Sequence, residues 1–307
     1  MSKQAAAAQV DSPEQKPSEK HAIGEAISET IHGDEESQTE TRIIAIANHK
    51  GGVGKTTTAV NLADCLAQVG NWVLVVDLDP QTNASQHIGN THPARVVYNA
   101  CELLSNLEGD IGSYIYEDTT IEGVHLVYGS ISLENVDEII KNEHPRPVEV
   151  LKERLRPLIG LYDYIIIDCP PSLKLLTQNA IAAATHYMVP VESGAPYAIN
   201  GLDDLKLRVN KVMRVNESLK FLGALLIKHD ERQVLCRDNA VDAIQLFGKL
   251  IPVKISMTAK VNQSIAQKTS VRMADRNNKV SKQYQELAEY IANETAGQGL
   301  KAGERAK

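Results

Sequence analysis

The sequence has few aromatic residues, few cysteines and no long apolar run. Aromatic residues make up 4% of the 307 positions, with two phenylalanines and one tryptophan, so stacking of nucleic-acid bases on aromatic rings is not the expected binding mode. No stretch approaches the roughly eighteen consecutive apolar residues of a membrane-spanning helix, and the first residues lack the basic-then-apolar order of a signal peptide. The sequence therefore predicts a cytoplasmic protein with no membrane partner.

The four cysteines lie far apart in the sequence. They stand at positions 65, 101, 169 and 236, and no two of them form a Cys-x-x-Cys pair. This spacing predicts neither a disulfide framework nor a structural zinc site. Cys169 follows Asp168, but a single cysteine there is typical of a small buried residue rather than of a shared iron–sulfur cluster.

Charge is unevenly distributed along the chain. The net charge is −7, yet residues 1–41 hold nine Asp or Glu against three Lys or Arg, whereas residues 200–290 hold sixteen Lys or Arg against ten Asp or Glu. The acidic extension, 1–41, has too few apolar residues to offset the entropy of ordering and is expected to be mostly disordered. It is either a solvated tail or a docking peptide. The second alternative stays open because Ile23, Ile27 and Ile31 have the spacing of a short helix that could form on contact with a partner.

From Arg42 onward, short apolar runs alternate with helical patterns. The runs are nearly continuously apolar, which is typical of strands covered on both faces. A β-α-β alternation predicts an α/β fold over residues 42–295, with a single doubly wound, mostly parallel sheet and helices on both faces. Residues 296–307 are expected to form a flexible tail. The expected strands are 42–48, 72–77, 124–128, 164–168, 187–191 and 221–227, and the expected helices are 55–69, 95–106, 147–159, 173–184, 199–215, 233–247, 259–268 and 280–293.

The strongest functional signal is the glycine-rich segment from Lys50 to Thr57, which directly follows the first expected strand and precedes a helix. Its glycines let successive backbone N–H groups point at an anion, and the helix N-terminus adds positive potential. Lys55 is expected to neutralise β- and γ-phosphate oxygens, and Thr56 to offer its hydroxyl to Mg²⁺. The strict P-loop has glycine at position 49, where this chain has His49. The expected nucleotide-binding residues are Lys50, Gly51, Gly52, Val53, Gly54, Lys55, Thr56 and Thr57.

Two further strands end in carboxylates. Asp77 and Asp79 close the second expected strand, and Asp168 closes the fourth. Ligands of open α/β sheets bind beyond the carboxyl ends of the strands, so these acids should meet the glycine-rich loop at one edge.

From Arg42 to Ile291, these motifs resemble the ParA/MinD family of deviant Walker-A P-loop ATPases, and most closely the ParA-type partition ATPases. The resemblance implies that Lys50 reaches across a dimer interface to the partner's nucleotide. It implies as well that Lys50, Lys55 and Asp79 are the catalytic residues. It also implies that Asp79 positions the attacking water, that Asp77 lies near the Mg²⁺ ion, and that Asp168 is the Walker-B acid, in the second shell of the metal.

The resemblance extends to a segment near the adenine, with some departures elsewhere. The segment from Leu250 to Lys254, followed by the helix over 259–268, resembles the family's loop near the adenine, which makes Pro252 a candidate nucleotide contact. His49 and Thr82 stand where glutamine and glycine are more usual. Because threonine lacks the freedom of glycine at positive φ, the loop after Gln81 is expected to follow a different path.

The resemblance implies a Mg²⁺-dependent ATPase that uses ATP and Mg²⁺ as cofactors. It also implies a homodimer in the ATP state, nonspecific binding to double-stranded DNA, a nucleoid location, and a ParB-like adaptor that stimulates hydrolysis during plasmid or chromosome partition. Two alternatives remain open: positioning of a protein cargo such as a carboxysome or chemoreceptor cluster, and MinD-like spatial regulation. The last twelve residues, with one leucine and several glycines, do not resemble a membrane-binding amphipathic helix.

The basic C-terminal third favours DNA among these roles. Contacts from Lys and Arg to phosphates are indifferent to sequence. The acidic extension is too short and too polar for a separate helix-turn-helix domain. The candidate DNA-binding residues are Arg232, Lys254, Lys260, Arg272 and Arg276, of which the first two fall close to positions used for DNA in ParA relatives.

Overall fold

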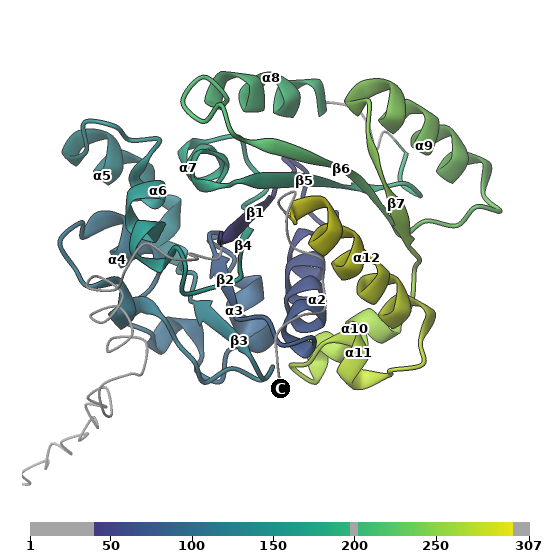
Figure 1. The fold of residues 1–307 in the computed structure, drawn as a ribbon, viewed down its shortest axis with the longest axis horizontal. Helices are drawn as coiled ribbons and strands as arrows, with labels where there is room; N and C mark the ends of the chain where they lie inside the picture. The colour runs from purple at the N-terminus through teal and green to yellow at the C-terminus, as the bar shows by residue number, and fades with distance from the viewer. Residues whose placement is uncertain (1–39, 197–201, 297–307) are drawn as a thin grey trace, which may run out of the picture. The chain divides into compact units, whose positions relative to one another are not determined.

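The computed structural model describes residues 40–196 and 202–296, and these residues build one seven-stranded parallel sheet (Figure 1). The strand order is β3-β2-β4-β1-β5-β6-β7. The doubly wound, parallel sheet predicted from the sequence is confirmed, as are all six expected strands. The strands are β1 (Arg42–Ile46), β2 (Val73–Asp77), β3 (Val124–Val127), β4 (Tyr164–Asp168), β5 (His186–Glu192), β6 (Lys220–Ile227) and β7 (Leu250–Ile255).

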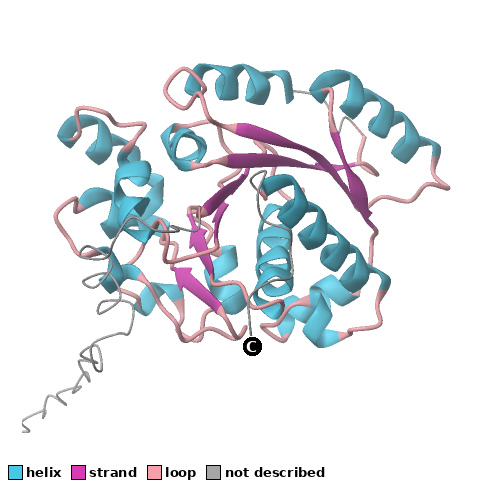
Figure 2. Ribbon diagram, viewed as in Figure 1, coloured by secondary structure: helices cyan, strands magenta, loops and turns pink. Residues whose placement is uncertain are grey.

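Helices cover both faces of the sheet (Figure 2). One face carries α2 and α12, which pack on each other, and the other carries α7, α8 and α9. The helices are α2 (Lys55–Gln68), α3 (Asn83–Ile88), α4 (Ala100–Ser105), α5 (Val136–Glu143), α6 (Val150–Leu155), α7 (Leu175–Ala183), α8 (Leu202–Val212), α9 (Val234–Phe247), α10 (Lys260–Ala266), α11 (Val271–Ala274) and α12 (Lys279–Thr295). No helix in the described ranges is long and apolar enough to cross a membrane.

Burial explains why the central strands are apolar throughout. Ile44, Val75 and Ile166 on β1, β2 and β4 have no exposed surface, and they share a core with residues of α2 and α12 such as Leu62 and Leu287. Side chains on both sides of each strand are removed from water, so no polar alternation is needed.

The segment that resembles the family's adenine loop is a strand, which corrects the expectation of a loop. Leu250–Ile255 forms β7 at the edge of the sheet, beside β6. Pro252 lies within this strand, where the pairing register with β6 shifts between Ala224 and Leu226. Proline is tolerated at an edge strand with an irregular ladder, because its missing N–H removes no central hydrogen bond.

Three helices were not expected from the sequence. They are α3, α5 and α11, all of eight residues or fewer. Thr82, the N-cap of α3, has a φ of 54°, so this threonine adopts the left-handed conformation that glycine favours. The expectations for residues 1–39 and 297–307, and for the start of the helix over 199–215, lie outside the described residues.

The strand register brings the acidic strand ends together. Asp168 pairs with Ile46 of β1 on one side and with Asp77 of β2 on the other. The three strand ends therefore lie side by side at the carboxyl edge of the sheet, where β1 continues into the glycine-rich loop.

Candidate nucleotide site

The glycine-rich loop curls over the end of β1 and leads into α2. Gly52 and Gly54 both have φ values of 72°, a left-handed conformation that disfavours any side chain. A Cβ at Gly54 would also lie 2.5 Å from the Ile227 Cδ1 atom. Glycine is thus favoured at position 54 by its conformation, and a side chain there would also displace the end of Ile227.

The two lysines of the loop are linked through the backbone. The Lys55 ammonium is mostly buried and donates a 2.9 Å hydrogen bond to the Lys50 carbonyl. Burial lowers the pKa of Lys55, while the nearby charges of Asp168 and Asp79 oppose that shift. Burial also lowers the pKa of Lys50, which is half-buried. Lys55 is therefore a partly desolvated cation held at the mouth of the loop.

Thr56 and Asp168 provide oxygen atoms suited to Mg²⁺. The Thr56 hydroxyl donates a 2.6 Å hydrogen bond to the Asp168 Oδ2 atom, and the Asp168 side chain is fully buried. Its Oδ1 atom has no hydrogen-bond partner in the described part of the protein. Burial, and then the charge of Asp77, raise the pKa of Asp168 well above its usual value. A buried carboxylate oxygen with no partner, beside a hydroxyl, fits a site that gains a divalent cation with its water.

The same described ranges contain no cluster of three or more His, Cys, Asp or Glu side chains that could hold a metal by themselves. Nucleotide-bound Mg²⁺ needs no such cluster, because phosphates and water supply most of its ligands. Thr56 and Asp168 are therefore the residues of this chain that would hold the ion.

Asp77 organises the turn that carries Asp79. Its carboxylate accepts hydrogen bonds from the Ser85 amide (2.8 Å), the Ser85 hydroxyl (2.6 Å) and the Asp79 amide (3.1 Å). The Ser85 hydroxyl in turn accepts a hydrogen bond from the Gly129 amide. Burial raises the pKa of Asp77 to about 6, although these hydrogen bonds act in the opposite direction. Ser85 was not expected from the sequence, because it belongs to the unexpected helix α3.

Asp79 lies at the cavity where a nucleotide would bind. Its side chain is largely buried, and its Oδ1 atom accepts a 3.0 Å hydrogen bond from the Gln81 amide. Burial raises the pKa of Asp79, opposed by the Gln81 hydrogen bond and by the positive charge of Lys55. Asp79 is therefore a fixed carboxylate beside the phosphate-binding loop.

A cavity of about 720 Å³ brings most of the predicted residues together. It is large enough for a nucleotide-sized ligand. Three predicted nucleotide-binding residues are not in its lining: Lys50 is half-buried, Val53 is buried, and Pro252 is exposed on β7. The predicted acids Asp77 and Asp168 are not in the lining either, because both are fully buried. The lining comprises Gly51, Gly52, Gly54, Lys55, Thr56, Thr57, Asp79, Gln81, Asn83, Gln86, His87, Pro171, Lys228, Val261, Asn262, Ile265, Ala266 and Lys268.

Part of the lining comes from α10, in the segment that resembles the family's adenine region, but the two additional lysines were not expected from the sequence. Lys228 and Lys268 both have positive φ values, of 50° and 51°. Lys268 donates to the Gly89 carbonyl at 3.0 Å, and His87 contacts the neighbouring Thr269 carbonyl at 2.9 Å. The cavity is thus closed by two segments far apart in the sequence, since Lys268 and Gly89, which follows α3, are 179 positions apart.

Two of the five candidate DNA-binding residues lie at one cavity. Arg232 and Lys254, together with Lys228 and Lys279, line a second cavity of about 810 Å³. Each of the two candidates has an acidic neighbour: Arg232 lies 2.8 Å from Asp230, and Lys254 lies 2.6 Å from Glu231. These pairs are partly exposed, where an ion pair contributes little and can exchange for a phosphate.

The other three candidates lie elsewhere. Lys260 lies 3.5 Å from Asp275, and Arg276 is exposed. Arg272 binds the buried Asp64 with two hydrogen bonds of 2.8 and 2.7 Å, so its guanidinium has a structural partner on α2.

Sequence and structure comparisons assign this site to a class. The profile of a family described as an AAA domain matches residues 41–221. The sporulation initiation inhibitor protein Soj of Bacillus subtilis is 35% identical over 253 residues, covering 82% of this chain and 98% of Soj. The chromosome partitioning protein ParA of Myxococcus xanthus is 37% identical over 226 residues, covering 72% of this chain and 78% of that protein.

A solved structure with bound nucleotide shares the fold. Cobyrinic acid a,c-diamide synthase from Mycobacterium smegmatis, with bound ATP analogue and magnesium, is similar with a TM-score of 0.74 and 30% identity, covering 84% of this chain and 97% of that one. Fold, loop and carboxylates together define a P-loop ATPase. Within that class, the chain belongs to the ParA/MinD family.

Proposed function

We propose that this protein is an ATP-dependent dimerising switch that binds DNA nonspecifically and hydrolyses ATP to partition a plasmid or chromosome. Residues 42–295 form its ATPase domain, between an acidic extension (1–41) and a C-terminal tail (296–307). The observation that carries the proposal is the convergence of Lys55, Thr56 and Asp79 on one cavity, with Asp168 behind Thr56. Relatives named chromosome partitioning protein ParA, at 37% and 32% identity, support the cellular role.

Hydrolysis of ATP at this site relies on positioning and charge. Lys55 offers a partly desolvated ammonium to the β- and γ-phosphates. Asp79 holds the attacking water, and its carboxylate is fixed by the Gln81 amide and by the turn that Asp77 organises. Bound Mg²⁺ supplies further positive charge to the phosphates, and Thr56 is its protein ligand.

Dimerisation follows from the second lysine. We assign Lys50 to the nucleotide of the partner subunit, so a monomer has an incomplete site. ATP then stabilises the dimer, and hydrolysis releases it. Basal hydrolysis is expected to be slow, because the motifs of the site contain no arginine finger, and a ParB-like adaptor with a basic segment accelerates it.

DNA binding is assigned to the basic C-terminal third of the chain. The protein would then lie on the nucleoid in the cytoplasm. Four cations and two carboxylates line one cavity at the ends of β6 and β7, and the excess of positive charge supports phosphate binding there. Lys260 and Arg276 are further candidates on the following segments. Arg272 is the weakest of the five, because its charge is neutralised by Asp64.

Fluorescence anisotropy with two unrelated DNA duplexes tests this role. Both duplexes should bind with similar affinity when ATP and Mg²⁺ are present, and much more weakly without nucleotide. If neither binds with ATP, while ATP-dependent dimerisation persists, the DNA role is wrong. The alternative, a switch that positions a protein cargo without DNA, then takes its place.

A further inference from the structure

A third cavity, of about 530 Å³, lies at the opposite edge of the sheet from the nucleotide site. Trp72 and Gly123 directly precede β2 and β3, so the cavity is at the amino-terminal edge. The P-loop lies at the first residue of α2 and this cavity at its last turns, about 20 Å away along the helix. The lining residues are Asp64, Ala67, Gln68, Gly70, Asn71, Trp72, Ile121, Glu122, Gly123, Arg272 and Met273.

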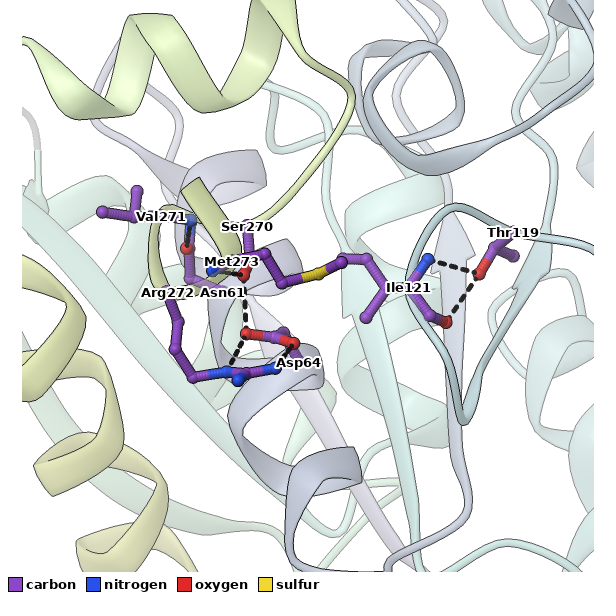
Figure 3. A network of polar contacts seen from close by, with 8 residues as sticks. All are labelled: Asn61, Asp64, Thr119, Ile121, Ser270, Val271, Arg272 and Met273. Carbon is purple, nitrogen blue, oxygen red and sulfur yellow. Dashed lines mark hydrogen bonds and ion pairs between the residues drawn. The ribbon is translucent and has the colours of Figure 1, made fainter. Parts of the chain in front are cut away.

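Hydrogen bonds hold two walls of this cavity in place (Figure 3). On one side, Asp64 of α2 accepts hydrogen bonds from the Arg272 guanidinium and, at 2.6 Å, from the Ser270 hydroxyl. On the other side, the Thr119 hydroxyl shares its one hydrogen between the carbonyls of Ile121 (2.9 Å) and Val124 (2.7 Å). Because both walls are braced, a ligand would meet a preformed site and would lose little of its binding energy in ordering the protein.

The cavity exposes apolar side chains that the fold does not cover. Trp72, the single tryptophan of the chain, is 56% exposed, and Met273 is 48% exposed. The Trp72 ring packs edge-on against His125 at 5.4 Å, and His125 packs on Tyr162. A half-exposed tryptophan supported by other rings is typical of an anchor point for a protein partner.

The charge around Trp72 is negative. The cation in the lining, Arg272, is neutralised by Asp64, which leaves Glu122 as the exposed charged residue of the lining. The Asp163 carboxylate accepts a 2.9 Å hydrogen bond from the Trp72 amide and adds a second negative charge. This face is thus opposite in sign to the cavity with Arg232 and Lys254, and electrostatic complementarity favours a basic ligand.

We propose that this cavity is a docking site for a basic peptide segment of a partner protein. An apolar side chain of the segment packs against Trp72 and Met273, while Lys or Arg side chains lie beside Glu122 and Asp163. The site needs neither nucleotide nor DNA, so its occupancy can be measured apart from the ATPase function.

The test uses the full-length protein without nucleotide and two fluorescein-labelled twelve-residue peptides. One alternates lysine with leucine, and the other alternates glutamate with leucine. Anisotropy should show the lysine peptide binding at least about tenfold more tightly, with a change in the emission of Trp72. Equal binding of both peptides, or tighter binding of the glutamate peptide, overturns the proposal.

Variants locate the binding site. Glu122→Lys should weaken the lysine peptide by roughly fivefold or more, because it reverses a charge at the rim. The matched control Glu143→Lys, at an exposed carboxylate on α5, should leave binding unchanged. Trp72→Ala should also weaken it, and Met273→Lys gives a second apolar test if loss of Trp72 lowers stability. Binding that survives Glu122→Lys and Met273→Lys contradicts the assignment.

Sedimentation of the nucleotide-free protein tests whether a second copy of the chain occupies the cavity instead of a peptide. The protein should sediment as a monomer, and Trp72→Ala should leave its sedimentation unchanged. A dimer that depends on Trp72 would show that a second copy of the chain covers this face, and the peptide proposal would then be wrong.

Discussion

The Thr56 hydroxyl donates a 2.6 Å hydrogen bond to the Asp168 carboxylate and thereby joins the first turn of α2 to the end of β4. Asp168 pairs in turn with Asp77 of β2, so two fully buried carboxylates lie on adjacent strands. The nucleotide-free site therefore concentrates negative charge where a cation is expected. This arrangement favours ligand binding at the expense of stability.

Replacing one of the buried acids should stabilise the nucleotide-free protein. Asp168→Asn keeps an acceptor for Thr56 and removes a buried carboxylate whose pKa is raised by burial and then by the charge of Asp77. At pH 8 the variant should gain about 1–3 kcal/mol in free energy of unfolding, measured by urea denaturation. It should also lose Mg²⁺-dependent nucleotide binding. A variant less stable than wild type at pH 8 would contradict the repulsion between these acids.

The sign of the pH dependence follows from the raised pKa of Asp77. Its pKa is about 6 in the folded protein and 3.8 without perturbation, so the folded state binds the proton more tightly. The resulting stability is fully present below about pH 4 and is lost as the pH rises through 6. The pKa of Asp168 is raised as well, by burial and then by the charge of Asp77, so the advantage of Asp168→Asn should shrink as the pH falls from 8 to 5. Glu143→Gln, at an exposed position, serves as the control and should show no such trend.

Asp79→Ala should trap the ATP-bound dimer. The water loses its orienting carboxylate, while Lys55 and Thr56 remain to hold the phosphates. Phosphate release should fall by roughly two orders of magnitude or more, with dimerisation retained, as measured by a coupled assay and by sedimentation. Hydrolysis close to the wild-type rate would mean that Asp79 only closes the end of β2.

Arg272 and Arg276 should respond differently to substitution, although both were expected to bind DNA. Arg272→Ala leaves the Asp64 carboxylate buried without its cation and should cost about 3 kcal/mol in free energy of unfolding. Arg276→Ala, at an exposed side chain, should change stability by less than about 0.5 kcal/mol. Thermal or urea unfolding of the two variants decides this, and equal effects would contradict the structural role of Arg272.

Contacts to DNA phosphates should make binding steeply dependent on salt. About six contacts imply a loss of roughly three decades in affinity between 50 and 200 mM salt. Arg232→Ala and Lys254→Ala should each remove one phosphate contact and so reduce the slope of log affinity against log salt concentration by about one, for both duplexes alike. Lys152→Ala, at an exposed lysine of α6, is the control and should leave the slope unchanged. A slope unaffected by both Arg232→Ala and Lys254→Ala would exclude the cavity at β6 and β7 from the DNA surface.

Local patterns were enough to predict the sheet and the phosphate site. Residues 72–77 and 164–168 are apolar and end in Asp77 and Asp168, so both the strands and their common edge could be inferred. Lys55 and Thr56 follow from the glycine-rich loop itself. For the same reason the short edge strand β7 was missed: it contains Pro252 and Lys254, which the pattern of a buried strand excludes.

Interactions between distant segments could not be predicted from the sequence. Asp64 and Arg272 are 208 positions apart, and neither lies in a motif. Ser85 was missed because α3 has six residues, too few for a helical period to stand out, and begins at a threonine in the left-handed conformation. Such contacts arise from packing, which a single sequence does not display.

The dimerisation of a Lys50→Ala variant tests the central claim most directly. Static light scattering with a nonhydrolysable ATP analogue and Mg²⁺ should give the mass of a dimer for the wild-type protein and of a monomer for the variant. Labelled-nucleotide titration should show that the variant keeps much of its nucleotide affinity, because Lys55 is intact. A Lys50→Ala protein that dimerises normally with the analogue would contradict the role of Lys50 across the interface.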